Sequence, residues 1–162
     1  MQPPPINHVA VSVTDIDEFV RWYSRILGFQ LMGRIRHLKR SDTPQSGLFR
    51  IYPTEVNEVK IAHMATGNGV GFEVFEFVDP TPMSAPQSFN HNLKGGFFHI
   101  CVTDPNPDLL AQKVTDAGGR RIGETVKHET AGFECLYVAD PWGNAVEILS
   151  ISFERVSSSI AR

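Results

Sequence analysis

Two histidines and two glutamates repeat a single arrangement along this 162-residue chain. His8 and His99 each lie in a stretch that alternates as a β-strand does, and each is followed twenty residues later by a glycine. Glu73 follows the first histidine and Glu147 the second, both in further strand-like stretches. Imidazole nitrogen and carboxylate oxygen together suit a divalent transition metal. The repeat therefore predicts a site for one divalent ion, of Fe, Mn, Ni, Co or Zn, held by these four side chains.

An insertion accounts for the unequal spacing of the two copies. The separation is 65 residues from His8 to Glu73 and 48 residues from His99 to Glu147. The excess of 17 residues matches the segment Leu38–Thr54, which has no counterpart in the second copy. Loops accept insertions of this size at little cost in free energy. Our hypothesis for this segment is a lid over a cleft.

Each copy predicts the order strand, helix, strand, strand, strand. Apolar alternation with a period of two marks the strands, and apolar residues at helical spacing mark one helix in each copy. Asp15 can cap the first helix and Gly28 can end it, whereas Asn106-Pro107 begins the second helix. The expected strands are 6–13, 29–35, 59–65 and 70–78 in the first copy, and 97–103, 120–126, 134–139 and 145–151 in the second.

These elements predict an α+β protein with a single domain over residues 1–162. It consists of two tandem βαβββ modules, the first at about 5–79 and the second at about 96–153. The stretch at about 80–95 is rich in Pro, Ser and Asn and is expected to be the linker.

The alternation also predicts which face of each sheet carries the polar groups. Successive strand residues point to opposite faces, so His8, Glu73, His99 and Glu147 all point away from the apolar residues that must pack on the helices. Glu76 has the opposite parity and is expected to be solvated or at an edge. The remaining histidines considered, His37, His63 and His91, are expected to be surface or loop residues.

Composition restricts the classes of partner and compartment. The net charge is −3 and 20% of the residues are charged, which gives no reason to expect nucleic acid or an anionic membrane as a partner. No signal peptide and no bilayer-length apolar run is present in the sequence. The two cysteines, Cys101 and Cys135, are interpreted as buried small hydrophobes, and the polar C-terminus is expected to fray. We therefore expect a cytoplasmic protein.

The stretch from Leu136-Tyr137 through Asp140-Pro141 to Glu147 resembles the strand-turn-strand motif that closes each module in the vicinal oxygen chelate superfamily. The resemblance covers residues 5 to 151. The superfamily includes glyoxalase I, methylmalonyl-CoA epimerase, fosfomycin-resistance enzymes, extradiol dioxygenases and bleomycin-resistance proteins. It implies a cleft between two modules, with His8, Glu73, His99 and Glu147 as the metal ligands.

Within the superfamily, two His and two Glu ligands are similar to the pattern of glyoxalase I and the epimerases. This implies a lyase or isomerase in which the ion chelates neighbouring oxygens of a small substrate and stabilises an enolate. Glu73 and Glu147 would be the bases that move a proton on the adjacent carbon. The sequence has Ser12 where glyoxalase I has an arginine that binds glutathione, which argues against a glutathione adduct.

Two other activities remain open. The spacing of His128, Tyr137 and Glu147 also resembles the signature of extradiol ring-cleaving dioxygenases. In such an enzyme His8, His99 and Glu147 would bind Fe(II), and His128 and Tyr137 would hydrogen-bond the bound catecholate or oxygen. The other alternative is a non-enzymatic binder of small molecules, as in the bleomycin-resistance branch.

Apolar residues surround the predicted site and extend beyond it. Those that share a face with the proposed ligands favour an aromatic or polyketide-like substrate: Phe75, Phe77, Phe97, Leu149 and Ile151. The runs 72–77 and 148–153 hold more apolar side chains than one cleft needs. Since large exposed apolar patches mark interfaces, we expect a homodimer.

Overall fold

The computed structural model describes residues 2–82 and 95–160. The chain divides into two compact units, Met1–Ser84 and Ala85–Arg162, and each is described here by itself. Most of the predicted linker, about 80–95, and His91 lie outside the described residues.

The first unit is a five-stranded sheet with two helices. Its strands follow the order β1-β5-β4-β2, and β3 pairs with β4 next to β2. β1 runs parallel to β5, whereas the other pairs are antiparallel. The elements are β1 (His8–Ser12), α1 (Ile16–Ile26), β2 (Gln30–Leu31), β3 (Arg36–Lys39), α2 (Gly47–Ile51), β4 (Glu58–Ala65) and β5 (Gly71–Asp79).

Helix α1 covers one face of this sheet, as its apolar spacing predicts. Asp15 caps it by accepting a hydrogen bond from the Glu18 N–H. Phe19 and Tyr23 are buried and stack near Phe72 of β5. Glu76 lies on this face too. The prediction of a solvated or edge position is wrong, because its carboxylate accepts hydrogen bonds from the Ile16 N–H and the Lys60 ammonium, each at 2.9 Å.

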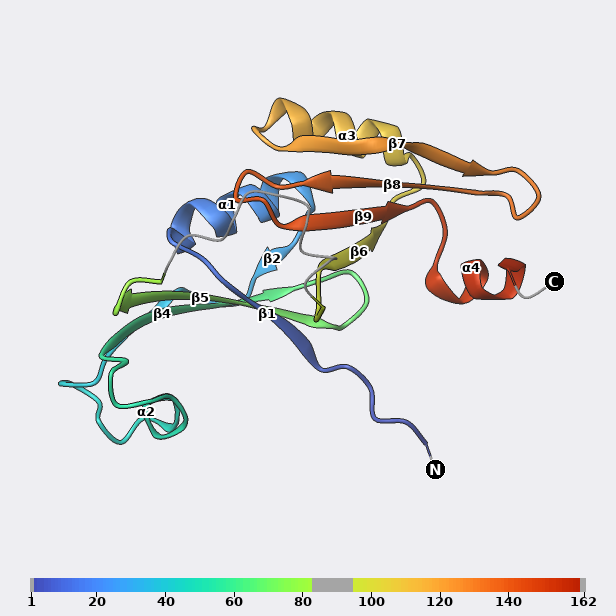
Figure 1. Ribbon diagram of the computed structural model, residues 1–162. Coiled ribbons are helices and arrows are strands. Elements are labelled where there is room, and N and C mark those ends of the chain that lie inside the picture. Colours follow the sequence, from blue (N-terminus) through green and yellow to red (C-terminus); the bar gives the residue numbers. More distant parts are fainter. Residues whose placement is uncertain (1, 83–94, 161–162) are drawn as a thin grey trace. The chain divides into compact units, whose positions relative to one another are not determined.

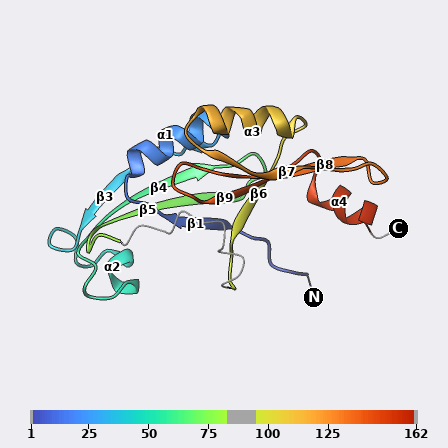
Figure 2. The ribbon, with the colours of Figure 1, turned by 45° about the horizontal axis from the view of Figure 1, so that its top comes forward.

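The insertion Leu38–Thr54 forms part of the opposite face. Figure 2 shows α1 and α2 on the two sides of the unit's sheet. Phe49 of α2 is buried with Val59 and Ile61 of β4, and Phe75 and Phe77 pack against this cluster. The Arg40 guanidinium donates hydrogen bonds to the carbonyls of Phe49 and Pro53 in the segment and of Val56 just after it. The insertion is therefore packed onto the sheet.

One predicted strand of the first unit is wrong. The stretch 29–35 is not continuous, because Gly33 adopts a φ of 76° and turns the chain between β2 and β3. L-residues with a side chain rarely adopt this region, so the glycine determines the break.

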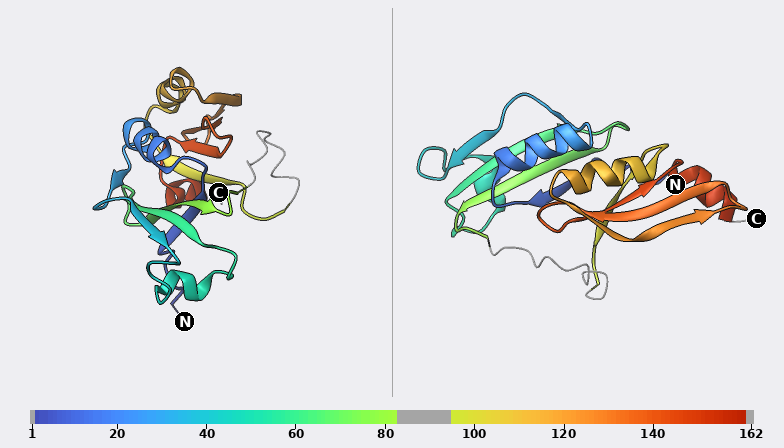
Figure 3. Two further views of the ribbon diagram at one scale, coloured as in Figure 1. Left: turned by 90° about the vertical axis from the view of Figure 1, so that its left-hand side faces the viewer. Right: turned by 90° about the horizontal axis from the view of Figure 1, so that it is seen from above.

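The second unit repeats the architecture with four strands (Figure 1). Its sheet has the order β6-β9-β8-β7, with β6 parallel to β9. Leu110, Ala111 and Val114 of its first helix are buried, as are Val146 and Ile148 of β9. Figure 3 shows this helix along its own sheet. The elements are β6 (His99–Thr103), α3 (Pro107–Asp116), β7 (Arg120–His128), β8 (Phe133–Ala139), β9 (Ala145–Leu149) and α4 (Phe153–Ile160).

The α+β class is confirmed, and both modules are βαβββ-like, the first with an additional strand and helix. The C-terminal end differs from the prediction, because β9 stops at Leu149 and residues 153–160 form helix α4 instead of fraying. No helix among the described residues is long and apolar enough to cross a membrane.

Several residues expected to be exposed are buried within their own unit. Phe72 and Val74 pack on the α1 side, and Ile148 is fully buried on the α3 side. The argument for a dimer from runs 72–77 and 148–153 therefore does not hold for the buried side chains Phe72, Val74, Ile148 and Leu149. Two other residues are more exposed than expected. Phe97, which precedes β6, is fully exposed. Cys101 was interpreted as a buried residue, but it is exposed and has a free thiol.

Candidate functional site

The first unit places His8 and Glu73 together. His8 begins β1 and Glu73 lies in the adjacent, parallel β5, on the face opposite α1. The His8 Nε2 lies 3.3 Å from Glu73 Oε2. Opposite His8 the partner strand has Gly71, where an added Cβ would lie 3.0 Å from the His8 Cβ, so this glycine leaves room for the imidazole.

A neighbouring amide determines how His8 presents its ring. Nδ1 of His8 lies 2.8 Å from Asn7 Oδ1. Since a carbonyl oxygen only accepts, Nδ1 donates to Asn7, and Nε2 is directed toward the Glu73 carboxylate. Metal-bound imidazoles commonly have their other nitrogen donating to a carbonyl or carboxylate oxygen in this way.

The site contains a histidine that the sequence analysis missed. His63 lies in β4 directly opposite Glu73, with its Nε2 3.0 Å from Glu73 Oε1. His63 is partly exposed at the surface, as predicted, but it lies in a strand and contacts Glu73, which the prediction did not include. The turn at residues 67–69 could have revealed the contact, because pairing Ala65 with Gly71 across it brings residues 63 and 73 opposite each other.

The second unit repeats the pair with His99 and Glu147. His99 Nε2 lies 3.2 Å from Glu147 Oε2, on the first and last strands of the module. The other ring nitrogen, Nδ1, is the buried side-chain polar atom without a hydrogen-bond partner among the described residues. His99 thus lacks the amide that orients His8.

Two protonated side chains flank Glu147 on the neighbouring strands. Cys101 of β6 and Tyr137 of β8 are both in register with it. Desolvation, followed by the negative charge of Glu147 and a hydrogen bond to it, raises the pKa of Cys101 to about 12 and the pKa of Tyr137 to about 12. Both groups therefore stay neutral donors at physiological pH. The Tyr137 ring also meets His99 edge-on, with centroids 5.3 Å apart.

A tight turn sets the direction of the strand that carries Glu147. The buried Asp140 accepts hydrogen bonds from the backbone N–H groups of Trp142 and Asn144 and from the Asn144 side chain. Gly143 completes the turn with a φ of 91°. The predicted role of this turn in positioning β9 agrees with these contacts.

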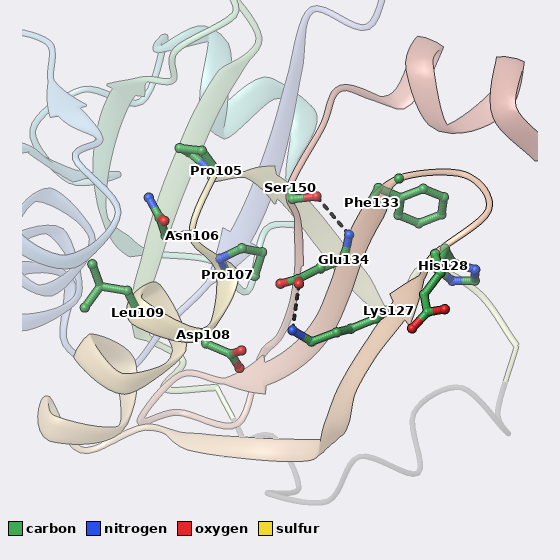
Figure 4. A pocket seen from close by; sticks show the side chains of 12 residues that line it. Pro105, Asn106, Pro107, Asp108, Leu109, Lys127, His128, Phe133, Glu134 and Ser150 are labelled. Carbon is green, nitrogen blue, oxygen red and sulfur yellow. Dashed lines mark hydrogen bonds and ion pairs between the residues drawn. The ribbon is translucent and has the colours of Figure 1, made fainter.

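His128 lies away from Glu147. It pairs with Phe133 and stacks on its ring at 4.3 Å, four residues along β8 from Tyr137. At roughly 3.3 Å per residue this is about 13 Å along the strand. His128 instead lines a pocket of about 650 Å³, in which Lys127 and Glu134 form an ion pair at 2.9 Å (Figure 4). The structure therefore brings Tyr137 to the glutamate and His99, but not His128.

The two half-sites suit a divalent ion. Two ligands that bind side by side at about 2.1 Å from one ion lie roughly 3.0 Å apart. The His–Glu separations of 3.3 Å and 3.2 Å are close to that value. Within residues 2–82 and 95–160, no three His, Cys, Asp or Glu side chains gather as ligands of one ion.

Known proteins share this fold across most of the chain. A glyoxalase family protein from Bacillus cereus superimposes with a TM-score of 0.71 at 19% identity, covering 92% of this chain and 95% of that one. The fosfomycin resistance protein FosX from Listeria monocytogenes superimposes with a TM-score of 0.62 at 10% identity, covering 97% and 98%. A FosX variant from that organism has been crystallised with Mn(II) and 1S,2S-dihydroxypropylphosphonic acid, and its TM-score is 0.58 at 10% identity, with 95% and 98% covered.

In sequence, a 2-epi-5-epi-valiolone epimerase from Actinomyces sp. is 23% identical over 151 residues, which is 90% of this chain and 79% of that protein. The family model described as Glyoxalase/Bleomycin resistance protein/Dioxygenase superfamily matches residues 5–148, close to the range predicted from the closing motif. The chain therefore belongs to the glyoxalase/bleomycin resistance protein/dioxygenase superfamily.

Proposed function

We propose that this protein is a divalent-metal-dependent enzyme that transfers a proton on a carbon atom of a small molecule, as an epimerase or a related isomerase or lyase does. One ion would be held by His8, Glu73, His99 and Glu147. These residues offer two imidazole nitrogens and two carboxylates, a donor set that suits Mn, Fe, Co, Ni or Zn.

The observation that carries the proposal is the repeated His–Glu pair. In each unit a histidine on the first strand approaches a glutamate on the last strand, at 3.3 Å and 3.2 Å. The parallel pairs β1–β5 and β6–β9 produce this approach twice, on the face without α1 in one unit and without α3 in the other. A structural role for a single pair would not require its repetition on equivalent strands.

The chemistry follows from the side chains around each carboxylate. When bound, a divalent ion supplies a Lewis acid that polarises a carbonyl oxygen beside the reacting carbon. Glu73 and Glu147 are the two carboxylates able to accept a proton from that carbon and return it. Having two such groups suits epimerisation, in which a proton leaves one side of a carbon and arrives on the other. Tyr137 remains protonated and orients Glu147 by a hydrogen bond.

The relatives support this class of reaction. One sequence relative is named for the epimerisation of 2-epi-5-epi-valiolone, and a FosX neighbour carries Mn(II). The presence of Glu73 next to His8 favours four protein ligands over the three expected of an Fe(II) dioxygenase. The distance of His128 from Glu147 along β8 removes the residue that distinguished the dioxygenase signature.

The test uses deuterium uptake. The protein with Mn(II) is incubated in D2O with 2-epi-5-epi-valiolone, and loss of the proton signal at the exchanging carbon is followed by NMR. We expect Glu73→Gln and Glu147→Gln each to reduce exchange by about 100-fold or more, since each removes a ligand and a possible base. Glu134→Gln, a matched change in an exposed ion pair of β8, should leave exchange unchanged.

The contradicting result is specific. If the wild-type chain exchanges no proton but consumes oxygen with catechols, and Glu73→Gln keeps that activity, the protein is a dioxygenase and the proposal is wrong.

A further inference from the structure

We propose that His63 is a positioning residue that holds one oxygen of Glu73 and thereby leaves the other oxygen for the metal ion. The inference rests on the proposed function, since it concerns how that site binds its ion. It assigns a role to a residue outside the four ligands.

The two histidines near Glu73 contact different atoms. His8 Nε2 approaches Oε2 at 3.3 Å, and His63 Nε2 approaches Oε1 at 3.0 Å. The shorter of these distances joins His63 to Oε1 as an ion-pair contact, on the oxygen that His8 does not approach. In the proposal, His63 is the donor that binds Oε1 of Glu73.

The strand pairing fixes the position of His63. β4 lies between β5 and β2 in the sheet, and residues 63 and 73 face each other in the ladder. On the other side, the His63 carbonyl accepts a hydrogen bond from the Met32 N–H at 2.8 Å. The backbone on both sides thus holds the imidazole against Glu73 before any ion binds.

A bound carboxylate benefits from such a partner. A free carboxylate rotates and can offer either oxygen or both, whereas a hydrogen bond to Oε1 selects Oε2 as the single ligand atom. Outer partners of this kind typically change metal affinity by about 10–100-fold when they are removed. His63 is assigned to Oε1 of Glu73 and is not one of the four proposed ligands.

The chain offers a matched control in the same sheet. His37 of β3 also contacts a glutamate, with its Nε2 2.6 Å from Glu58 Oε1, and its side chain is 45% exposed against 43% for His63. His37 pairs with Lys60 rather than with a site residue, so it lies on the α1 face. Removing it takes away an equally exposed His–Glu pair that the inference does not involve.

The experiment measures Mn(II) affinity by titrating the full-length, metal-depleted protein and following the EPR signal of free Mn(II). We expect His63→Leu to weaken binding by about 10–100-fold. His63→Gln, whose amide nitrogen can reach the position of Nε2 and donate, should keep most of the affinity. His37→Leu should bind as the wild type does, and thermal denaturation should show that all variants fold.

Three results would overturn the inference. If His63→Leu binds Mn(II) as tightly as the wild type, His63 does not position Glu73. If His63→Gln is as weak as His63→Leu, the hydrogen bond is not the cause. If the wild-type chain binds no Mn(II), both the inference and the proposed function fail. The first two results would contradict the inference alone and leave the proposed function standing.

Discussion

At the scale of single residues, the two proposed catalytic carboxylates lie in different surroundings. Glu73 lies between the imidazoles of His8 and His63. Glu147 has one imidazole, His99, together with a phenol and a thiol that both stay protonated. The two glutamates are therefore equivalent in the repeat but not in chemistry, which is what a reaction with one proton acceptor and one proton donor requires.

The His37–Glu58 pair provides a prediction about pH and stability. The hydrogen bond from His37 is the largest cause that lowers the pKa of Glu58 below its usual 4.5. A lowered folded-state pKa stabilises the folded chain above the unfolded value, and this contribution disappears as the pH falls through the folded value. The Tm difference between wild type and His37→Leu should therefore be largest above about pH 5 and shrink toward about pH 3. A difference that stays constant over this range would show that Glu58 does not titrate in this way.

At the scale of elements, the turn at Asp140 connects sequence to site most directly. Its carboxylate satisfies two backbone N–H groups and one side-chain amide within five residues, and it is almost completely buried. Asp140→Ala leaves these donors without an acceptor, so we expect a loss of about 1–3 kcal/mol in the free energy of unfolding. Urea denaturation measures this loss. A variant as stable as the wild type would mean that the turn does not depend on Asp140.

The elements also show what the sequence could and could not predict. The strands that carry His8, Glu73, His99 and Glu147 were predicted because their alternation is regular and one face must pack on a helix. The break at Gly33 was missed because a single glycine in an apolar stretch is compatible with a continuous strand and also with a turn. Helix α4 was missed because serines in 157–159 resemble a polar tail.

His63 was missed for a different reason. Its role depends on which residue faces it across a ladder, and register is a property of two strands and their turn rather than of one stretch. Phe72 and Ile148 were predicted to be exposed but are buried. The alternation of a strand does not show how much of its apolar face the helices α1 and α3 cover.

At the scale of the whole molecule, we expect a homodimer. Large apolar side chains remain exposed in both units, among them Ile51 at 81% and Phe153 at 74%. Exposed apolar surface of this kind is commonly covered by association. Light scattering at micromolar concentration should report about twice the 18.0 kDa of one chain. A particle of 18.0 kDa would contradict the prediction.

The central claim is the proposal that His8, Glu73, His99 and Glu147 are ligands of a divalent ion. The most direct measurement is the number of Mn(II) ions bound per chain by equilibrium dialysis with metal analysis, for the wild type, His8→Ala and His99→Ala. The account predicts one ion per chain in the wild type and a large loss of affinity in both variants, because each histidine belongs to a different half-site. Two ions per chain, or full binding after the loss of either histidine, would contradict it.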